Sequence, residues 1–307
     1  MIIYHPPARR DEAVVDAMRS AAAGRKGVIF GPEARAAFNA GIAAGTPPPA
    51  GVTYREDRVG GVTGWWCEPA EPMPGAAVLY LHGGCYVLGS AEALRHFAGH
   101  FALRTGASTF VPDYRLAPEH PFPAAIDDAL AVYLGLAGEA ERIVVAGDSA
   151  GGGLTLALLA ALAGINAPVR QPLGAAGLSP WTDLALTGTS LDTRAEADPV
   201  FTRGVLAHFA GLYLQGADPA DPQASPLYGP MPAAAPPIRI DVGDDEVMLD
   251  DALRYARRAR DAGLAGTAHV WAGMPHVFVS AIGRLAAADA AMAEIGAFLT
   301  GCLQSGE

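Results

Sequence analysis

The pentapeptide Gly147-Asp148-Ser149-Ala150-Gly151 places a serine hydroxyl in a tight, glycine-flanked turn. The apolar run 142–146 precedes it and the apolar run 154–159 follows it, so the sequence predicts a strand, a turn and a helix. Such a turn exposes the hydroxyl at the carboxyl end of a strand, and the first amides of the helix point toward any negative charge formed there. We therefore predict that Ser149 is a nucleophile.

A serine nucleophile needs a base, and the base needs an acid that orients it. His276 follows the predicted strand 267–271 and has the position of a base on a loop returning to the sheet edge. The acidic segment Asp241-Val242-Gly243-Asp244-Asp245-Glu246 ends the preceding strand, and Asp241, Asp244 and Asp250 are alternatives to Asp245 as the acid. The residues alone leave the choice of carboxylate open, but the chain order serine, acid, histidine is typical of an α/β-hydrolase.

Amide donors for an oxyanion are expected in the segment His82-Gly83-Gly84-Cys85, which follows the apolar run 78–81. We predict that the amides of Gly83, Gly84 and Ala150 form the oxyanion hole. We expect His82 to anchor the loop by hydrogen bonds and to take no part in proton transfer.

The elements that position these residues alternate between strands and helices, which predicts an α/β fold with a mostly parallel sheet covered on both faces. After a hairpin at 52–59 and 62–67, strands are predicted at 76–82, 107–111, 142–147, 172–178, 238–242 and 267–271, and helices at 91–105, 123–137, 152–163, 249–262 and 286–302. Residues 51–184 and 226–307 form the predicted core. Residues 1–50 and 185–225 are helical in character and form a predicted cap.

Composition narrows the function classes. The 307-residue chain is 51% hydrophobic and carries a formal net charge of −11, which argues against a nucleic-acid or anionic-membrane partner. Its one lysine, Lys26, is far from Ser149 in sequence, so a Ser-x-x-Lys dyad is excluded. Three scattered cysteines and an N-terminus without an apolar signal core indicate a cytoplasmic protein with reduced thiols.

No cofactor or metal is expected. His96 and His100 have a metal-binding spacing on a predicted helix, but no third ligand accompanies them. Asp113, Arg115 and Glu119 are expected to pair with one another and brace a loop. Four aromatic residues are candidates for an acyl pocket, although core packing is the simpler interpretation; these are Phe38, Phe201, Phe209 and Tyr213.

These motifs together resemble the bacterial hormone-sensitive-lipase family of esterases over nearly the whole chain. The resemblance rests on His82-Gly83-Gly84, on residues 147–152, on residues 113–125 (DYRLAPEHPFPAA), on residues 243–250 (GDDEVMLD) and on the His276 loop. It implies an α/β-hydrolase fold with a helical cap, Asp245 as the triad acid, hydrolysis of short to medium acyl esters, and a possible homodimer.

One position departs from the family, which usually has glycine where this chain has Cys85. We expect the Cys85 side chain to narrow the acyl pocket and to make activity sensitive to thiol reagents. The predicted mechanism requires a neutral His276, so activity should fall below about pH 6.5.

Other functions would use the same residues. An amidase, a lactonase or an acyltransferase forms the same acyl-enzyme and differs in leaving group or acceptor. A non-catalytic receptor on this fold is disfavoured because Ser149, Asp245 and His276 are all present.

Overall fold

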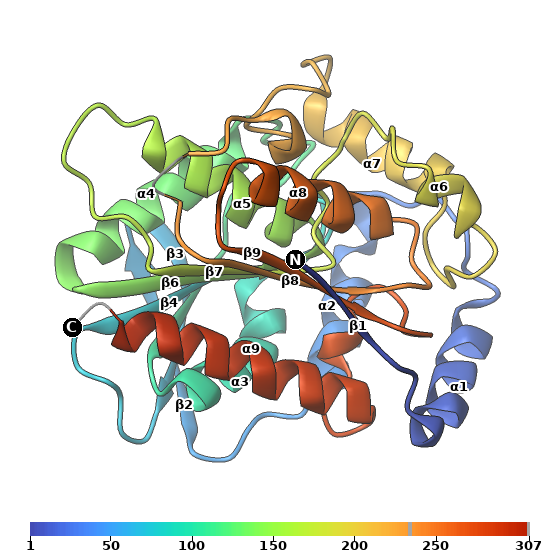
Figure 1. Cartoon of the computed structure of the whole chain (residues 1–307), viewed down its shortest axis with the longest axis horizontal. Helices are drawn as coiled ribbons and strands as arrows, with labels where there is room; N and C mark the ends of the chain where they lie inside the picture. The colour runs from blue at the N-terminus through green and yellow to red at the C-terminus, as the bar shows by residue number, and fades with distance from the viewer. Residues whose placement is uncertain (233–234, 306–307) are drawn as a thin grey trace.

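A nine-stranded sheet forms the centre of the computed structural model, which describes residues 1–232 and 235–305 (Figure 1). Its strands follow the order β1-β9-β8-β7-β6-β4-β5-β3-β2. β3 runs antiparallel to its neighbours β2 and β5, and the other pairs are parallel. The strands are β1 (Ile2–His5), β2 (Val52–Val59), β3 (Val62–Pro69), β4 (Ala76–Leu81), β5 (Ser108–Pro112), β6 (Arg142–Asp148), β7 (Gly174–Leu178), β8 (Ile238–Gly243) and β9 (Gly266–Trp271).

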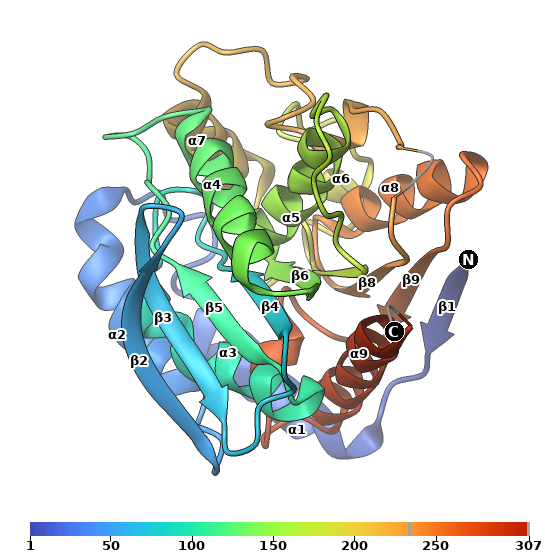
Figure 2. The same cartoon turned by 90° about the vertical axis from the view of Figure 1, so that its left-hand side faces the viewer.

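Helices cover both faces of this sheet, as Figures 1 and 2 show. α4 (Ala124–Glu139), α5 (Ser149–Ala163) and α8 (Leu249–Asp261) lie on one face, and α3 (Ala91–Thr105) and α9 (Ala286–Gln304) lie on the other. β4 is buried along its whole length because both its faces contact helices. The predicted α/β-hydrolase architecture is confirmed, including the β2–β3 hairpin.

The first residues of the chain correct one prediction. Residues 1–50 were expected to be helical, but Ile2–His5 form β1 and pair in parallel with β9 at the edge of the sheet. The run Ile-Ile-Tyr-His has strand-forming side chains, yet four residues give too short a pattern to recognise without the neighbouring strand.

The remaining N-terminal residues and the insertion are largely helical and lie at the same end of the sheet (Figure 1). α1 (Glu12–Ala22) and α2 (Arg35–Gly45) come from the N-terminal region, and α6 (Ser190–Thr193) and α7 (Arg203–Leu214) from residues 185–225. Arg19 and Lys26 donate hydrogen bonds to the carbonyl oxygens of Ala197 and Ala195, at 2.8 and 2.6 Å. Two segments far apart in sequence therefore contact each other directly.

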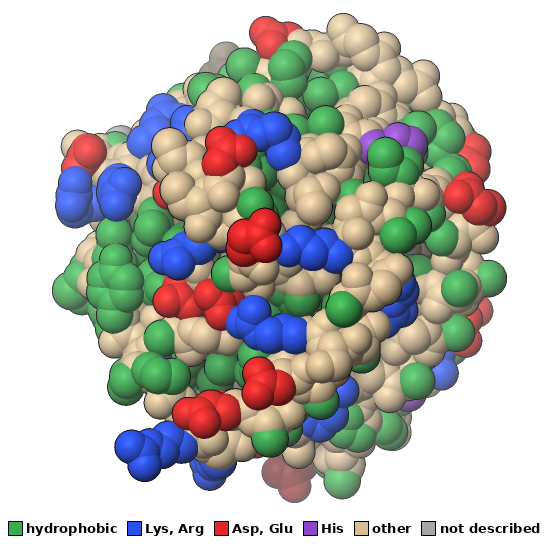
Figure 3. All heavy atoms as spheres, turned by 90° about the vertical axis from the view of Figure 1, so that its right-hand side faces the viewer, with side chains coloured by type: hydrophobic (Ala, Val, Ile, Leu, Met, Phe, Trp, Pro, Cys, Tyr) green, Lys and Arg blue, Asp and Glu red, His purple; other side chains and the backbone are tan. Residues whose placement is uncertain are grey.

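Figure 3 shows the side of the molecule on which these helices lie. Acidic and basic side chains are interspersed across this face, and no large patch of one sign covers it. Such a surface gives little electrostatic preference for a charged ligand.

α9 is the one helix within residues 1–232 and 235–305 that is long and apolar enough to cross a bilayer. Half of its apolar stretch is buried, and it packs against α3 and β7. α9 is thus a core helix of this fold.

Candidate active site

Ser149 lies between β6 and α5 with a positive φ of 54° and a side chain that is almost fully buried. A left-handed conformation is costly for a residue with a Cβ, by roughly 1–3 kcal/mol, and marks the strained turn that presents a nucleophile. The flanking glycines serve a different purpose, because a Cβ on Gly147 or Gly151 would overlap the carbonyl oxygen of Leu81. They allow the close approach of β4 to this turn.

His276 lies directly beside Ser149. It comes from the loop after β9, and its Nε2 is 3.0 Å from the Ser149 Oγ. Its Nδ1 donates a hydrogen bond of 2.6 Å to Glu246 Oε2. With its proton on Nδ1, the imidazole presents a lone pair to the serine hydroxyl, as a general base must. The sequence predictions for Ser149 and His276 agree with this geometry.

The acid beside His276 is Glu246, and the assignment of Asp245 is wrong. Asp245 points away and forms an ion pair with Arg19 of α1. The two residues are adjacent in the turn after β8, and consecutive side chains in a turn point in different directions, so the sequence could not show which one faces the histidine. The apolar Val247-Met248-Leu249 run after Glu246 is the one available signal, because it predicts that the chain enters the core there.

Glu246 is held rigidly. Its side chain is fully buried, and its Oε1 accepts hydrogen bonds from Ser179 Oγ at 2.7 Å and from the Gly243 amide at 2.8 Å. The same Ser179 Oγ accepts from the Val277 amide, next to His276, at 3.0 Å. One hydroxyl therefore braces both the acid and the loop that carries the base.

The negative charges around His276 favour the protonated form of its imidazole. Burial lowers the pKa of His276, but the negative charges of Glu246, Asp198 and Asp148 outweigh it, so the pKa is raised above its ordinary value of 6.5. Asp198 itself is buried and accepts amide hydrogen bonds from Val247, Val200 and Phe201. A protonated His276 imidazole is thus stabilised by several carboxylates.

The oxyanion loop requires a second correction. The Gly83 amide, predicted as an oxyanion donor, donates instead to Asp148 Oδ1 at 2.9 Å. A Cβ on Gly83 would overlap Asp148 Oδ2, so this glycine is needed for close packing. Asp148 also accepts from Tyr80 Oη at 2.6 Å, which fixes the carboxylate that holds the loop.

The amides of Gly84, Cys85 and Ala150 have no acceptor among the hydrogen bonds of the described residues. Gly84 and Cys85 have positive φ values of 120° and 55°, which turn successive amides toward one side, and Ala150 directly follows the nucleophile. This set, rather than Gly83, Gly84 and Ala150, is free to bind an oxyanion. The sequence identified the loop but not the direction of each amide.

Cys85 is buried, and burial raises the pKa of its thiol to about 12. A thiol rather than a thiolate is therefore present at neutral pH, and it is inaccessible. Both observations weigh against the expected sensitivity to thiol reagents.

The other residues singled out in the sequence have structural contacts. His82 Nδ1 is 2.7 Å from the Gly83 carbonyl oxygen, which agrees with an anchoring role. Asp113, Arg115 and Glu119 do not pair with one another. Their partners are the Ala91 amide, Asp128 and Arg35, respectively. His100 contacts the Pro47 carbonyl oxygen at 3.0 Å, so its partner lies in the N-terminal region.

One of the aromatic candidates lies beside His276. The ring of Phe201 meets the His276 ring edge to face, with centroids 4.9 Å apart. Tyr213 stacks on Tyr86, which follows Cys85, at 3.9 Å. Phe209 is buried in the hydrophobic core on the α4, α5 and α8 face of the sheet, and Phe38 packs against this core, as the simpler interpretation held.

Known proteins share this organisation. Residues 78–280 match a family model described as the α/β-hydrolase fold. An acetyl-hydrolase of Streptomyces hygroscopicus is 40% identical over 76% of each chain. An ethyl acetate hydrolase of Pseudomonas putida is 34% identical over 69% of this chain and 68% of its own.

A solved esterase of the bacterial hormone-sensitive-lipase family superimposes with a TM-score of 0.88 and 35% identity, covering 96% of this chain and 99% of the other. The superposition therefore spans the elements that carry the nucleophile turn, the glycine loop and the histidine loop. This chain belongs to the α/β-hydrolase family, among the bacterial hormone-sensitive-lipase esterases.

Proposed function

We propose that this carboxylic ester hydrolase cleaves short to medium acyl esters through an acyl-enzyme on Ser149. The observation that carries the proposal is the continuous chain of contacts from Ser149 Oγ to His276 Nε2 and from His276 Nδ1 to Glu246 Oε2, at 3.0 and 2.6 Å. This is the arrangement that a serine nucleophile, its base and an orienting acid require.

In the proposed first step, Ser149 Oγ attacks the ester carbonyl carbon while His276 Nε2 takes the hydroxyl proton. The carbonyl oxygen becomes an oxyanion, and the amides of Gly84, Cys85 and Ala150 donate hydrogen bonds to it. His276 then gives its proton to the departing alcohol, which leaves an ester between Ser149 and the acyl group.

Water completes the cycle. His276 removes a proton from the water, which attacks the acyl carbon, and the second tetrahedral intermediate collapses as Ser149 Oγ leaves with the proton from His276. The products are the carboxylic acid and free enzyme. Glu246 orients the His276 imidazole and stabilises the imidazolium in each half of the cycle.

The acyl length is supported by the relatives, which are an acetyl-hydrolase and an ethyl acetate hydrolase. Ser149 is 5% exposed and Phe201 contacts His276, so the described residues leave little open space at the nucleophile. A small acyl group fits such surroundings better than a long chain.

We also propose that residues 185–225 and the N-terminal region after β1 form a cap over this site. Arg19 supports it, because its guanidinium bonds both the Ala197 carbonyl oxygen and Asp245, the neighbour of Glu246. The ring of Phe30 meets that of Phe209 at 5.5 Å. Since Ser149 is buried, substrate entry requires this cap to move.

Three further expectations stay predictions. The buried free thiols of Cys67, Cys85 and Cys302 support a cytoplasmic location, which cell fractionation would test. Light scattering on a sizing column would test the homodimer. Lactone and amide turnover, compared with ester turnover, would test the alternative acyl-transfer functions.

The decisive experiment measures hydrolysis of a series of p-nitrophenyl esters of increasing acyl length by the wild type and by Ser149→Ala. We expect a maximum at short acyl chains and loss of that activity in the variant, with circular dichroism as the check on folding. A folded Ser149→Ala variant with wild-type turnover would refute the acyl-enzyme. A maximum at long acyl chains would refute the substrate class alone.

A further inference from the structure

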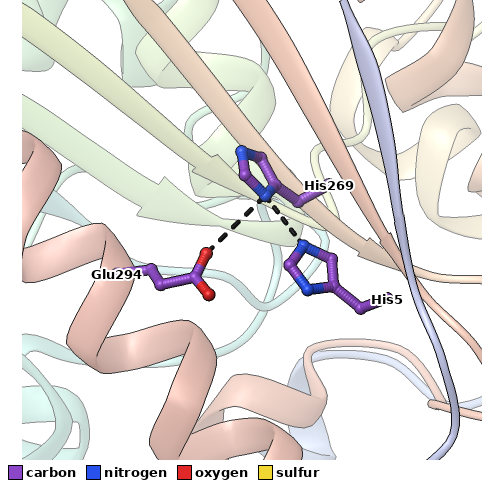
Figure 4. A group of neighbouring side chains, drawn as sticks. All are labelled: His5, His269 and Glu294. Atoms are coloured by element: carbon purple, nitrogen blue, oxygen red, sulfur yellow. Dashed lines mark hydrogen bonds and ion pairs between the residues drawn. The ribbon is translucent and has the colours of Figure 1, made fainter.

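Three side chains with metal-ligating atoms converge at the β1 edge of the sheet, and none of them belongs to the proposed triad. Figure 4 shows His5 from the end of β1, His269 from β9 and Glu294 from α9 pointing toward one another. One ligand atom from each lies within 4.8 Å of the other two. The three residues are distant in sequence, so the tertiary fold alone brings them together.

The distances suit a small ion. His5 Nε2 and His269 Nδ1 are 2.9 Å apart, and His269 Nδ1 and Glu294 Oε2 are 3.8 Å apart. Ligand bonds of about 2.0–2.1 Å in tetrahedral geometry place ligand atoms roughly 3.3 Å from one another. The observed separations lie on either side of that value, so small shifts of these side chains would bring the three atoms around one ion.

The side chains are already oriented. The His5 ring stacks on Trp271 with centroids 3.7 Å apart and planes 4° apart, and His269 is buried. Such packing limits the rotamers of both imidazoles, so little side-chain entropy remains to be lost on binding.

The surrounding charges decide whether a cation is tolerated. Arg239 Nη2 contacts Glu294 Oε2 at 2.9 Å, which is an unfavourable positive neighbour. Asp241 offsets it by accepting two hydrogen bonds from Arg239, at 2.7 and 2.9 Å, and a third from Trp271 Nε1. Arg239 also orients the Glu294 carboxylate on its approach to the two imidazoles.

We propose that His5, His269 and Glu294 bind a divalent transition-metal ion of the Zn²⁺ type, which joins β1 to β9 and α9. Two imidazoles and one carboxylate are a ligand set that Zn²⁺ uses, and Ca²⁺ and Mg²⁺ prefer all-oxygen sites. Glu294 is exposed, so water can complete the coordination. On binding, each imidazole carries its remaining proton on the ring nitrogen that faces away from the ion.

The site is structural. β1 is a four-residue edge strand, and the ion would link it to elements more than 260 residues away. The ester hydrolysis proposed above needs no metal, so its success or failure does not bear on this site.

The experiment titrates Co²⁺, a coloured substitute for Zn²⁺, into the tag-free and chelator-treated protein at neutral pH and follows visible absorption. We expect saturable d–d bands at one ion per chain, displacement of Co²⁺ by Zn²⁺, and a Tm that rises with Zn²⁺ concentration. His5→Ala and Glu294→Gln should each weaken binding by roughly tenfold or more. The exposed His120→Ala is the matched control and should bind as the wild type does.

Glu294→Gln protects the test against misfolding, because this exposed side chain changes little in size. Absence of saturable binding by the wild type would overturn the proposal, as would equal affinity in Glu294→Gln or His5→Ala. In that case the three residues are a hydrogen-bonded brace for β1. Loss of binding in His120→Ala would also overturn it, because the ion would then be held elsewhere.

Discussion

Replacing Glu246 by glutamine tests the corrected assignment of the catalytic acid. The substituted side chain keeps the shape of the original but loses its negative charge and gains an NH₂ group. The Gly243 amide and the Ser179 hydroxyl both donate to one oxygen of Glu246, so the glutamine carbonyl must remain on that side. The NH₂ group is then forced to face His276 Nδ1.

An NH₂ group in that position donates to Nδ1 and moves the imidazole proton to Nε2. The histidine can no longer accept the proton of Ser149, whose Oγ lies 3.0 Å from Nε2. An amide in place of the acid in a triad lowers kcat by about 10⁴, or about 5 kcal/mol of transition-state stabilisation. We therefore expect a loss of this size in Glu246→Gln.

The matched control is Asp245→Asn, one residue away. Asp245 pairs with Arg19 and does not touch His276, and the side chains of Asp245 and Arg19 are both partly exposed. Removing the charge of Asp245 should therefore lower the free energy of unfolding by about 0.5–1 kcal/mol and change kcat by less than about tenfold. Initial rates with p-nitrophenyl acetate, normalised to active sites, give the change in kcat, and urea denaturation gives the change in stability. The reasoning fails if Asp245→Asn shows the large loss and Glu246→Gln the small one.

Three more outcomes follow from the site. Carboxylates raise the pKa of His276 despite its burial, so this base becomes protonated as the pH falls through a value above 6.5. The kcat/KM should therefore decline in that range from a plateau at higher pH. A constant kcat/KM down to about pH 5 would contradict the role of His276 as the base. The Cys85 thiol is buried and has a pKa of about 12, so iodoacetamide at neutral pH should leave Cys85 unmodified and the activity intact. Mass spectrometry would detect any modification of Cys85. Rapid inactivation with labelled Cys85 would show that the thiol is accessible. Because Arg19 bonds the Ala197 carbonyl oxygen and Asp245, Arg19→Ala should increase amide hydrogen exchange in α1 and in residues 195–198. Ser149 should still react with a fluorophosphonate in this variant. Unchanged hydrogen exchange would mean that the Arg19 side chain does not hold the cap.

Much of the fold, and Ser149 and His276 of the proposed triad, could be predicted because they depend on local patterns. The strand, turn and helix around Ser149 occur within one short segment, and the alternation of strands and helices specifies a parallel sheet. β1 could not be recognised in this way, since its strand conformation depends on pairing with β9 at the far end of the chain.

The two wrong site assignments have a common physical cause. In each case, two residues near each other in sequence offer the same chemical group. Asp245 and Glu246 both offer a carboxylate for His276, and Gly83 and Cys85 both offer a backbone amide for the oxyanion. Which carboxylate faces His276 depends on Ser179 and the Gly243 amide, and which amides stay free depends on where Asp148 accepts a hydrogen bond. These partners lie at the ends of several different strands, so the direction of a side chain or an amide is a tertiary property.

The turn after β8 links the catalytic acid to the proposed cap. Its two successive carboxylates point to different partners, Glu246 to His276 and Asp245 to Arg19 of α1. Arg19 also holds the Ala197 carbonyl oxygen, next to Asp198, whose charge contributes to the raised pKa of His276. Any movement of α1 that admits a substrate must break contacts to the segments carrying Glu246 and Asp198. Closure of the cap over a bound ester would therefore restore, in one step, both the exclusion of water and the electrostatic surroundings that the base needs.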